Sequence, residues 1–218
     1  MAVQVFFCSI EPLREARLFA KYYGCASSDR RARVELLGKE DDRLRSLAAG
    51  LMLEQALNAC GVPPHLRRVE RMQNGKPVLA ESSLQFSLSH SGSVALCAIS
   101  ASPVGADVQT LRMPSPALVK RVCSAEEQRW LSSQPDFAVA FTSLWARKES
   151  LLKATDRTIA ADLRQLCVLS EQVFCFSETS LFGLPACVCC KVGGQVSWNG
   201  VDLADDEIQN SFDSSSQF

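Results

Sequence analysis

The sequence predicts an α+β protein built from two similar α/β lobes in one chain. A strand, a capped helix, a long helix and further strands follow one another in this order twice. The length of 218 residues is enough for one large domain or two small ones. A break near Pro103 divides the chain into lobes 1–102 and 103–218. A shared order of elements is weak evidence of repetition by itself, so a true internal repeat is a hypothesis here.

Composition and charge exclude several classes of protein. Hydrophobic residues make up 47% and charged residues 22%, as in ordinary globular proteins and unlike disordered, collagen-like or coiled-coil chains. No apolar run approaches the roughly 18 residues of a membrane span, and the N-terminus lacks the order of a signal peptide. The net charge of −1 gives no overall attraction to nucleic acid. We therefore expect a cytoplasmic protein without membrane or nucleic-acid partners.

The small net charge hides an asymmetry between the two parts of the chain. Residues 1–80 carry 13 Lys and Arg against 9 Asp and Glu, whereas residues 81–218 carry 10 against 15. A basic first part could bind an anionic ligand, and an acidic second part could bind a cation. Scattered, solvated charge is the alternative interpretation.

The first lobe is expected to begin with a buried strand over residues 3–10, because this apolar run ends at Glu11-Pro12. Ser27-Ser28-Asp29 has the composition of a helix N-cap. A strongly amphipathic pattern ends at Gly61. The expected helices are 13–23, 30–37 and 41–59, and the expected strands after the turn at residues 74–77 are 84–89 and 94–100.

The second lobe is expected to repeat this order. A strand over 104–111 leads into a Pro-containing loop, and Ser124 with Glu127 forms a capping-box pattern that opens a helix. A long helix over 137–154 and strands over 166–169, 173–177 and 185–192 follow. The Ser-rich, acidic residues 210–218 are expected to fray.

The ten cysteines are the unusual feature of the composition. Without a secretion signal we interpret them as reduced thiols that act as small hydrophobic residues. The cluster Cys187-Val188-Cys189-Cys190 permits a zinc site as an alternative. It lacks a second ligand pair, and the two histidines, His65 and His90, are distant in sequence, so a core strand is the favoured interpretation.

The strand that starts the second lobe carries a carboxylate among apolar residues. Alternation places Gly105, Asp107 and Gln109 on one face and three apolar residues on the other. A buried carboxylate is costly unless a cation or donor meets it. The alternative is an aspartate at a strand end that faces water.

Trp145, Glu149 and Lys153 lie on one face of the long helix, at spacings of four residues. A surface ion pair would explain Glu149 and Lys153, but Trp145 indicates a partly covered face. If Asp107 and Glu149 converge, their oxygens could hold Mg²⁺ and leave other positions for phosphate and water. Lys153 could then reach the same phosphates. His90, in a polar loop, could donate to a phosphate or merely cap the turn.

Four motifs occur in a characteristic order: Gly75-Lys76-Pro77, Ser89-His90-Ser91-Gly92, residues 105–109 and residues 145–153. In this order and spacing they resemble the Sfp-type 4′-phosphopantetheinyl transferases over nearly the whole chain. The resemblance implies that the two lobes form an intramolecular pseudo-dimer. It also implies the activity of a holo-[acyl-carrier-protein] synthase: Mg²⁺-dependent transfer of the 4′-phosphopantetheine arm of coenzyme A (CoA) to a serine of an acyl or peptidyl carrier protein, with release of adenosine 3′,5′-bisphosphate.

The resemblance assigns roles to the residues that match the family motifs. Asp107, Gln109 and Glu149 would be the metal ligands in the second lobe. Glu149 would also take the proton of the carrier serine, Lys153 would stabilise the transition state, and His90 and Asp107 would complete the catalytic set. Mg²⁺ and Mn²⁺ are not distinguished.

CoA contacts are implied mainly for the first lobe. Two arginines would bind the 3′-phosphate bidentately, and the Gly-Lys-Pro turn would contact the adenine side. The implied CoA-binding residues are Arg30, Arg33, Ser46, Gly75, Lys76, Pro77, Ser89, His90 and Lys153, with an alignment open by one residue toward Arg31 and Arg45.

Two residues depart from the family pattern. Gln109 stands where the family often has an acid, and Asp156-Arg157-Thr158 replaces a glycine-containing turn. Gln109 leaves open a non-catalytic homologue that binds CoA or a carrier protein. A cysteine-dependent metal or redox protein is a more remote alternative.

The basic, partly apolar loop over residues 111–122 resembles the carrier-docking surface of the family. A solvated loop between the lobes is the alternative. We expect a monomer, because the two lobes can build a site between them.

Overall fold

The computed structural model describes residues 2–157 and 163–214. The strands are β1 (Val3–Ser9), β2 (Val69–Arg71), β3 (Pro77–Leu79), β4 (Gln85–Ser91), β5 (Val94–Ser100), β6 (Val104–Val108), β7 (Phe174–Leu181), β8 (Leu184–Lys191) and β9 (Val196–Gly200). The α-helices are α1 (Ala16–Cys25), α2 (Ser28–Glu35), α3 (Glu40–Ala59), α4 (Pro116–Val122), α5 (Ala125–Ser132), α6 (Phe137–Ala154) and α7 (Asp206–Ser214), and short 3-10 helices cover Glu11–Arg14 and Pro64–Leu66.

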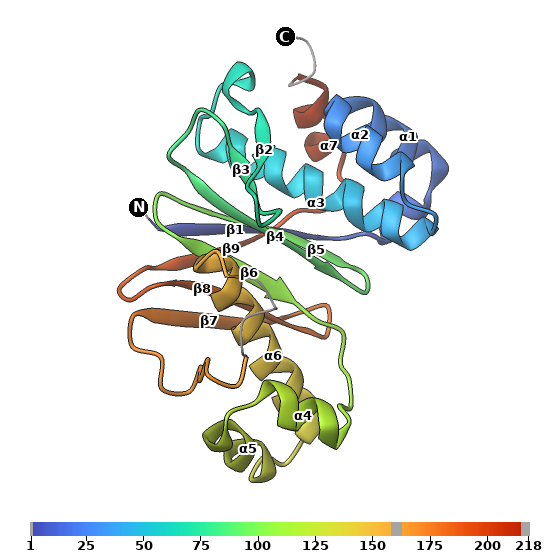
Figure 1. The fold of residues 1–218 in the computed structure, drawn as a ribbon. Coiled ribbons are helices and arrows are strands. Elements are labelled where there is room, and N and C mark those ends of the chain that lie inside the picture. Colours follow the sequence, from blue (N-terminus) through green and yellow to red (C-terminus); the bar gives the residue numbers. More distant parts are fainter. Residues whose placement is uncertain (1, 158–162, 215–218) are drawn as a thin grey trace.

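Two sheets lie against each other between layers of helices (Figure 1). The first sheet has the order β4-β5-β1-β9 and the second the order β6-β8-β7. Valine, leucine and alanine side chains from β1, β5, β6 and β8 pack together between them. Helix α3 packs on the first sheet, and α6 packs on β6 and β8 of the second.

The two lobes repeat the same topology, which confirms the predicted α+β fold of two similar lobes. In the first lobe a hairpin, β4-β5, pairs through β5 with the initial strand β1. In the second lobe the hairpin β7-β8 pairs through β8 with the initial strand β6. In each lobe three α-helices of the described residues lie between the initial strand and this hairpin.

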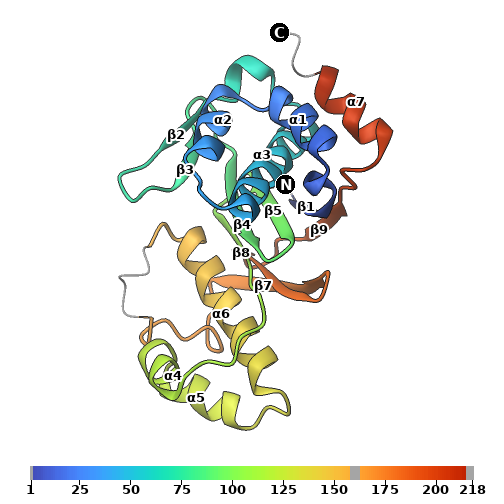
Figure 2. The same ribbon diagram turned by 90° about the vertical axis from the view of Figure 1, so that its right-hand side faces the viewer.

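The end of the chain returns to the first lobe. Strand β9 pairs in parallel with β1, and α7 packs against α1 at the side of the first lobe (Figure 2). The expected second lobe, 103–218, is therefore too long at its C-terminal end. The tail that is expected to fray from residue 210 is helical in α7 as far as Ser214; residues 215–218 lie outside the described part.

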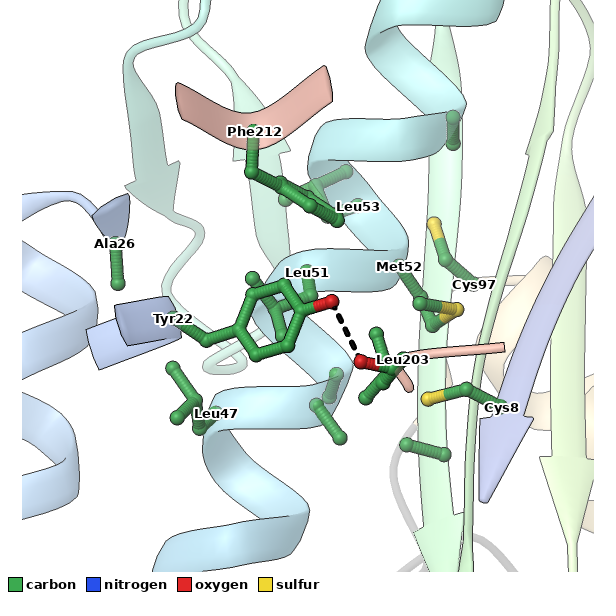
Figure 3. Close-up of a cluster of buried hydrophobic side chains, with 14 of the residues drawn as sticks. Cys8, Tyr22, Ala26, Leu47, Leu51, Met52, Leu53, Cys97, Leu203 and Phe212 are labelled. Carbon is green, nitrogen blue, oxygen red and sulfur yellow. Dashed lines mark hydrogen bonds between the residues drawn. The ribbon is translucent and has the colours of Figure 1, made fainter. Parts of the chain in front are cut away.

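The core of the first lobe explains why α7 docks there. Tyr22 of α1 is fully buried and donates its hydroxyl to the carbonyl of Leu203 at 2.8 Å (Figure 3). Phe212 of α7 meets the Tyr22 ring edge to face, with ring centres 5.4 Å apart. Removal of these aromatic rings from water stabilises the docked α7.

Three predicted elements differ in extent. Residues 166–169 are not a strand, because side chains rather than a neighbouring strand bind their backbone: Lys148 binds the carbonyl of Leu166, and Glu127 accepts from the amide of Val168. Strand β6 ends at Val108 instead of residue 111. The expected loop over 111–122 is a loop only to Ser115, which caps the short helix α4.

The cysteine cluster forms part of a core strand, as predicted. Cys187 and Cys189 lie in β8 and are fully buried, whereas Cys190 points to the opposite face, toward the other sheet. All ten cysteines are free thiols, and burial raises the pKa of Cys187 to about 12. Within residues 2–157 and 163–214 there is no group of three or more His, Cys, Asp or Glu side chains arranged to hold a metal.

Serines join the two lobes along a seam between β4 and β6. The hydroxyls of Ser87, Ser89 and Ser91 accept hydrogen bonds from the backbone amides of Ala106, Val108 and Thr110, respectively. These serines share one face of β4 because strand side chains alternate. The seam sets the position of β6, and with it Asp107, relative to the first lobe.

In the described part of the chain, the helices are too short or too polar to span a bilayer.

Candidate active site

A cleft of about 1570 Å³ lies where the two lobes meet. Helices α2 and α3, the β2-β3 hairpin, β4, β6 and the end of α6 contribute to its wall. Predicted site residues that line it are Arg30, Arg33, Gly75, Lys76, Pro77, Ser89, His90, Asp107, Gln109, Glu149 and Lys153. Residues far apart in sequence thus converge on one cavity.

Asp107 is held in place by three side-chain donors. Its Oδ1 accepts from the Ser89 hydroxyl and from Lys153 Nζ, both at 2.8 Å, and its Oδ2 accepts from Gln109 Nε2 at 2.7 Å. Only 3% of the residue is exposed. The expected partner cation for a buried aspartate is therefore present, and it is Lys153. The alternative of a water-facing aspartate is wrong.

Lys153 also joins the two lobes through backbone atoms. Its Nζ donates to the carbonyl of Ala106 in β6 at 2.9 Å and lies 3.4 Å from the carbonyl of Leu88 in β4. It remains partly exposed, with 30% of its side chain accessible. An ammonium group held in this way can still turn toward a ligand in the cleft.

Glu149 faces Asp107 from the adjacent helix. Burial raises the pKa of Glu149, the charge of Asp107 raises it further, and the charge of Lys153 opposes both effects. No hydrogen bond or ion pair of its carboxylate is found within residues 2–157 and 163–214. Glu149 is 9% exposed and lies near the charge of Asp107, so its ionised form is disfavoured. Binding of a proton or of a cation would remove this unfavourable charge.

Gly105 makes this approach of strand and helix possible. A Cβ at residue 105 would lie 1.8 Å from the carbonyl oxygen of Ser150 and 2.6 Å from the amide nitrogen of Ala154. Any side chain would force β6 away from α6 and separate Asp107 from Glu149 and Lys153. The Gly-x-Asp pattern thus has a packing reason that the sequence alone did not show.

The donor set fits a magnesium ion. Two carboxylates that repel each other, from β6 and α6, present hard oxygen ligands to an open cleft. Gln109 is placed differently from the expectation, because its amide nitrogen, rather than its oxygen, faces Asp107. Asp107 and Glu149 are therefore the main candidates for metal ligands, and ligation by Gln109 stays a prediction.

Two arginines of α2, Arg30 and Arg33, line the cleft. Partial burial, with the charges of Arg33 and Arg71, lowers the pKa of Arg30 to about 10. Burial and the charge of Arg71 also lower the pKa of Arg33. Mutual repulsion of cations in a cleft that they line indicates a site for an anion.

The side chain of Arg30, from α2, packs closely against Gly50 of α3. A Cβ at Gly50 would come within 2.6 Å of Arg30 Nε, so the glycine gives the side chain room. Arg30 donates through NH1 to the carbonyl of Ser46 at 3.1 Å. These contacts hold its guanidinium against α3, in the wall of the cleft.

The four arginines that the resemblance leaves open as CoA ligands differ in their positions relative to the cleft. Arg31 does not line the cleft and donates to the carbonyls of Gly24 and Ala26. Arg45 binds Asp42 and the carbonyl of Gly92. Arg30 and Arg33 are thus the better placed pair.

Ser46 is the one predicted CoA-binding residue that does not line the cleft. It is buried in α3, 3% exposed, and its side chain does not line the cleft. Its carbonyl accepts from Arg30 NH1 at 3.1 Å, and its buried Oγ has no hydrogen-bond partner among the described residues. The phosphate contact of Ser46 stays a prediction.

His90 lies exposed on the cleft wall, where partial loss of hydration lowers its pKa and the charges of Arg45 and Lys153 lower it further. A neutral imidazole in this basic surrounding would gain a proton when an anion binds nearby.

Lys76 directs its ammonium toward the end of α6, where it pairs with Asp156.

Sequence reasoning missed two groups of residues. Arg67, Arg68 and Arg71 also line the cleft, and their clustering in the basic first part of the sequence was the available signal. Lys148, adjacent to Glu149, is 1% exposed and pairs with fully buried Glu127 at 2.8 Å. This pair is structural, since both side chains also bind backbone groups of residues 163–168.

The segment before α4 exposes apolar side chains beside basic ones. Leu111 is 50% and Met113 73% exposed. The guanidinium of Arg112 lies over the Trp145 ring, 5.9 Å from its centre. An exposed apolar surface next to cations is typical of an interaction surface for an acidic partner.

The comparisons with known proteins agree with this geometry. Residues 12–102 match the family model described as 4′-phosphopantetheinyl transferase, N-terminal, and residues 103–196 match that of the 4′-phosphopantetheinyl transferase superfamily.

Similar proteins carry the same description. The chain is 28% identical to the 4′-phosphopantetheinyl transferase psf-1 of Bacillus pumilus, over 74% of this chain and 72% of the relative. It is 37% identical to the 4′-phosphopantetheinyl transferase HetI of a Nostoc species, over 62% of this chain and 61% of HetI. It is 29% identical to the 4′-phosphopantetheinyl transferase Sfp of Bacillus subtilis, over 48% of each chain. The chain therefore belongs to the family of Sfp-type 4′-phosphopantetheinyl transferases.

Proposed function

We propose that this protein transfers the 4′-phosphopantetheine arm of CoA to a serine of an apo carrier protein in a Mg²⁺-dependent reaction. The observation that carries the proposal is the convergence of Asp107, Glu149 and Lys153 at one end of a cleft whose other wall holds Arg30 and Arg33. Carboxylates and cations in one cavity match a substrate that has a pyrophosphate beside a separate phosphate.

The arginine-lined part of the cleft binds the 3′-phosphate of CoA in this proposal. Arg30 and Arg33 neutralise its charge, and the planar guanidinium groups match its oxygens. His90, on the same wall, gains a proton when the phosphate arrives. The turn at Gly75 and Pro77, with the aliphatic stem of Lys76, forms the wall for the adenine side.

Asp107 and Glu149 would hold Mg²⁺ together with the pyrophosphate. When bound, the ion would neutralise the negative charge that builds up on the leaving phosphate. Lys153 releases one of its contacts and adds a second positive charge at the same phosphates. Ser89 and Gln109 keep Asp107 oriented.

The carrier supplies the nucleophile. Its serine oxygen forms a bond to the phosphorus next to the pantetheine, and the bond from that phosphorus to the bridging oxygen breaks. Adenosine 3′,5′-bisphosphate leaves with the electron pair. Glu149, directly or through a water, takes the serine proton.

The exposed surface of Leu111, Met113 and the basic end of α4 is the proposed docking site for the carrier. Lys120 and Arg121 there would attract acidic carrier helices and speed encounter. We propose a monomer as the active form, since both walls of the cleft come from one chain. The carrier would belong to fatty acid, polyketide or nonribosomal peptide synthesis.

Replacing Glu149 with Gln tests the proposal. Loss of the proton acceptor should lower the rate of transfer about 10²- to 10⁴-fold, whereas the affinity for CoA measured by calorimetry stays within a few-fold. Full activity of E149Q would contradict the assigned role. A protein that binds CoA but modifies no carrier would support the alternative, a non-catalytic homologue, to which Gln109 gives some weight.

A further inference from the structure

The tip of the β2-β3 hairpin, which belongs to the first lobe, reaches across to the end of α6 in the second. Asn74 Nδ2 donates to the carbonyl of Asp156 at 2.9 Å. Lys76 Nζ donates to the carbonyl of Lys153 at 2.9 Å and pairs with Asp156 Oδ1 at 2.5 Å. We call Asn74, Lys76 and Asp156 the interlobe clasp.

The way in which α6 ends creates the acceptors for this clasp. Asp156 follows the last helical turn with a φ of +57°, a left-handed conformation that favours glycine. The amide of Arg157 then bonds back to the carbonyl of Leu152, while the carbonyl of Lys153 is left to accept from Lys76. A lysine at a helix C-terminus is also attracted by the helix dipole. Glycine would fit the turn, but only a side chain such as that of Asp156 adds an anion for Lys76.

The hairpin tip is held rigid on its own side. The amide of Lys76 donates to Asn74 Oδ1 at 3.0 Å, and Arg71 NH1 donates to the carbonyl of Gly75 at 2.8 Å. The side chain of Lys76 is only 12% exposed. Its ammonium therefore points to α6 from a fixed support and has two acceptors there.

Both sides of the clasp form the wall of the cleft. Gly75 and Lys76 line it from the hairpin, and Lys153 and Asp156 line it from α6. Lys153 also reaches Asp107, so a shift of the α6 end relative to the hairpin would move the catalytic groups relative to the ligand wall.

We propose that the interlobe clasp fixes the width of the cleft, and that Lys76 acts as a positioning residue rather than as a direct ligand of CoA. The part of this inference that concerns CoA rests on the proposed function. The competing assignment, in which Lys76 binds a phosphate of CoA, predicts the opposite effect of removing its anionic partner.

The substitution Asp156→Asn separates the two assignments. Asparagine tolerates the left-handed conformation, so the turn is kept while the charge is lost. If the clasp preorganises the cleft, D156N binds CoA about fivefold more weakly. If Lys76 is a ligand, D156N frees an ammonium and removes a repulsive carboxylate, and CoA binds more tightly.

A double-mutant cycle by calorimetry completes the test. D156N, K76M and the double variant should bind CoA with similar, reduced affinity, because either single change already opens the clasp. Asp29→Asn is the matched control, since Asp29 is an exposed carboxylate of the cleft wall outside the clasp; its affinity should be unchanged or higher. Unchanged or tighter binding by D156N, or additive losses in the double variant, would overturn the inference.

Hydrogen exchange of the ligand-free proteins tests the clasp without CoA. Residues 69–79 and the last turn of α6 should exchange faster in D156N and K76M than in the wild type, and the rest of the first lobe should not change. Equal exchange rates would overturn the clasp. A wild type that binds no CoA would refute the proposed function while this readout still decides the clasp.

Discussion

Helix α6 carries two lysine–carboxylate pairs, and they differ in their access to the cleft. Lys148 pairs with Glu127 and Lys153 pairs with Asp107, both at 2.8 Å. The first pair has side chains 1% and 0% exposed, and carbonyl groups occupy the remaining donors of the lysine. In the second pair 30% of the Lys153 side chain is exposed toward the cleft.

This difference separates a structural pair from the pair that we propose to be functional. The Lys148–Glu127 pair holds α5, α6 and residues 163–168 together, and every group in it already has its partner. The Lys153–Asp107 pair lies beside a carboxylate, Glu149, that has no partner in the described residues. Lys148 and Lys153 are a little more than one helical turn apart, yet only the pair of Lys153 is accessible to ligands. We call Lys148–Glu127 the closed pair and Lys153–Asp107 the open pair.

The largest effect on stability is expected from breaking the closed pair. Lys148→Met leaves Glu127 buried without a counter-charge, which costs about 3–5 kcal/mol of unfolding free energy. Urea unfolding at neutral pH measures this loss. The double variant K148M/E127Q should recover part of it, since the buried charge is then removed. A loss under 1 kcal/mol in K148M would contradict a structural role for the pair.

Breaking the open pair should instead reduce the activity. Lys153→Met removes the cation near the proposed phosphates and should lower the transfer rate about 100-fold. Ser89 and Gln109 still donate to Asp107, so the unfolding free energy should fall by about 1–2 kcal/mol at most. Unfolding and transfer assays on K148M and K153M together test the comparison. A stability loss in K153M equal to that in K148M would remove the distinction.

Gln109→Glu would give the open pair an additional anion. The variant replaces a donor to Asp107 with a carboxylate, so it should bind Mg²⁺ several-fold more tightly if residue 109 is near the ion. A transfer rate measured at rising Mg²⁺ should then reach half its maximum at lower metal than in the wild type. An unchanged Mg²⁺ titration would show that Gln109 is not close to the ion.

The smallest effect concerns pH and His90. The folded pKa of His90 is lowered by partial burial, Arg45 and Lys153, so on acidification the unfolded chain takes up this proton first. The contribution of His90 to stability is therefore lost as the pH falls below the unfolded value of about 6.5. Urea unfolding of H90Q over the same pH range should show a shallower loss than the wild type. Parallel curves for the two proteins would contradict the lowered pKa.

Much of the fold follows from local patterns. The capping box of Ser124 and Glu127 forms as expected, and the apolar runs of β1, β5 and β8 are buried strands. The alternation of β6 correctly places Gly105 and Asp107 on the face toward α6. These features depend on periodicity and capping, which a sequence displays directly.

Contacts between distant residues could not be predicted in this way. Strand β9 pairs with β1, beginning at Val3 and Val196. The backbone of residues 166–169 binds the buried Lys148–Glu127 pair instead of a neighbouring strand. Gln109 turns its amide nitrogen to Asp107, and Asp156 takes up a left-handed conformation and pairs with Lys76. Each outcome depends on a partner far away in the sequence.

The most direct test of the proposed function is the intact mass of several apo carrier proteins after incubation with the purified protein, CoA and Mg²⁺. At least one carrier should gain the mass of a single phosphopantetheinyl group, and the gain should disappear when Mg²⁺ is chelated or when the carrier serine is replaced by alanine. No mass gain in acyl and peptidyl carriers alike, with a protein that is folded and binds CoA, would contradict the proposal that the open pair and Glu149 form a transferase active site.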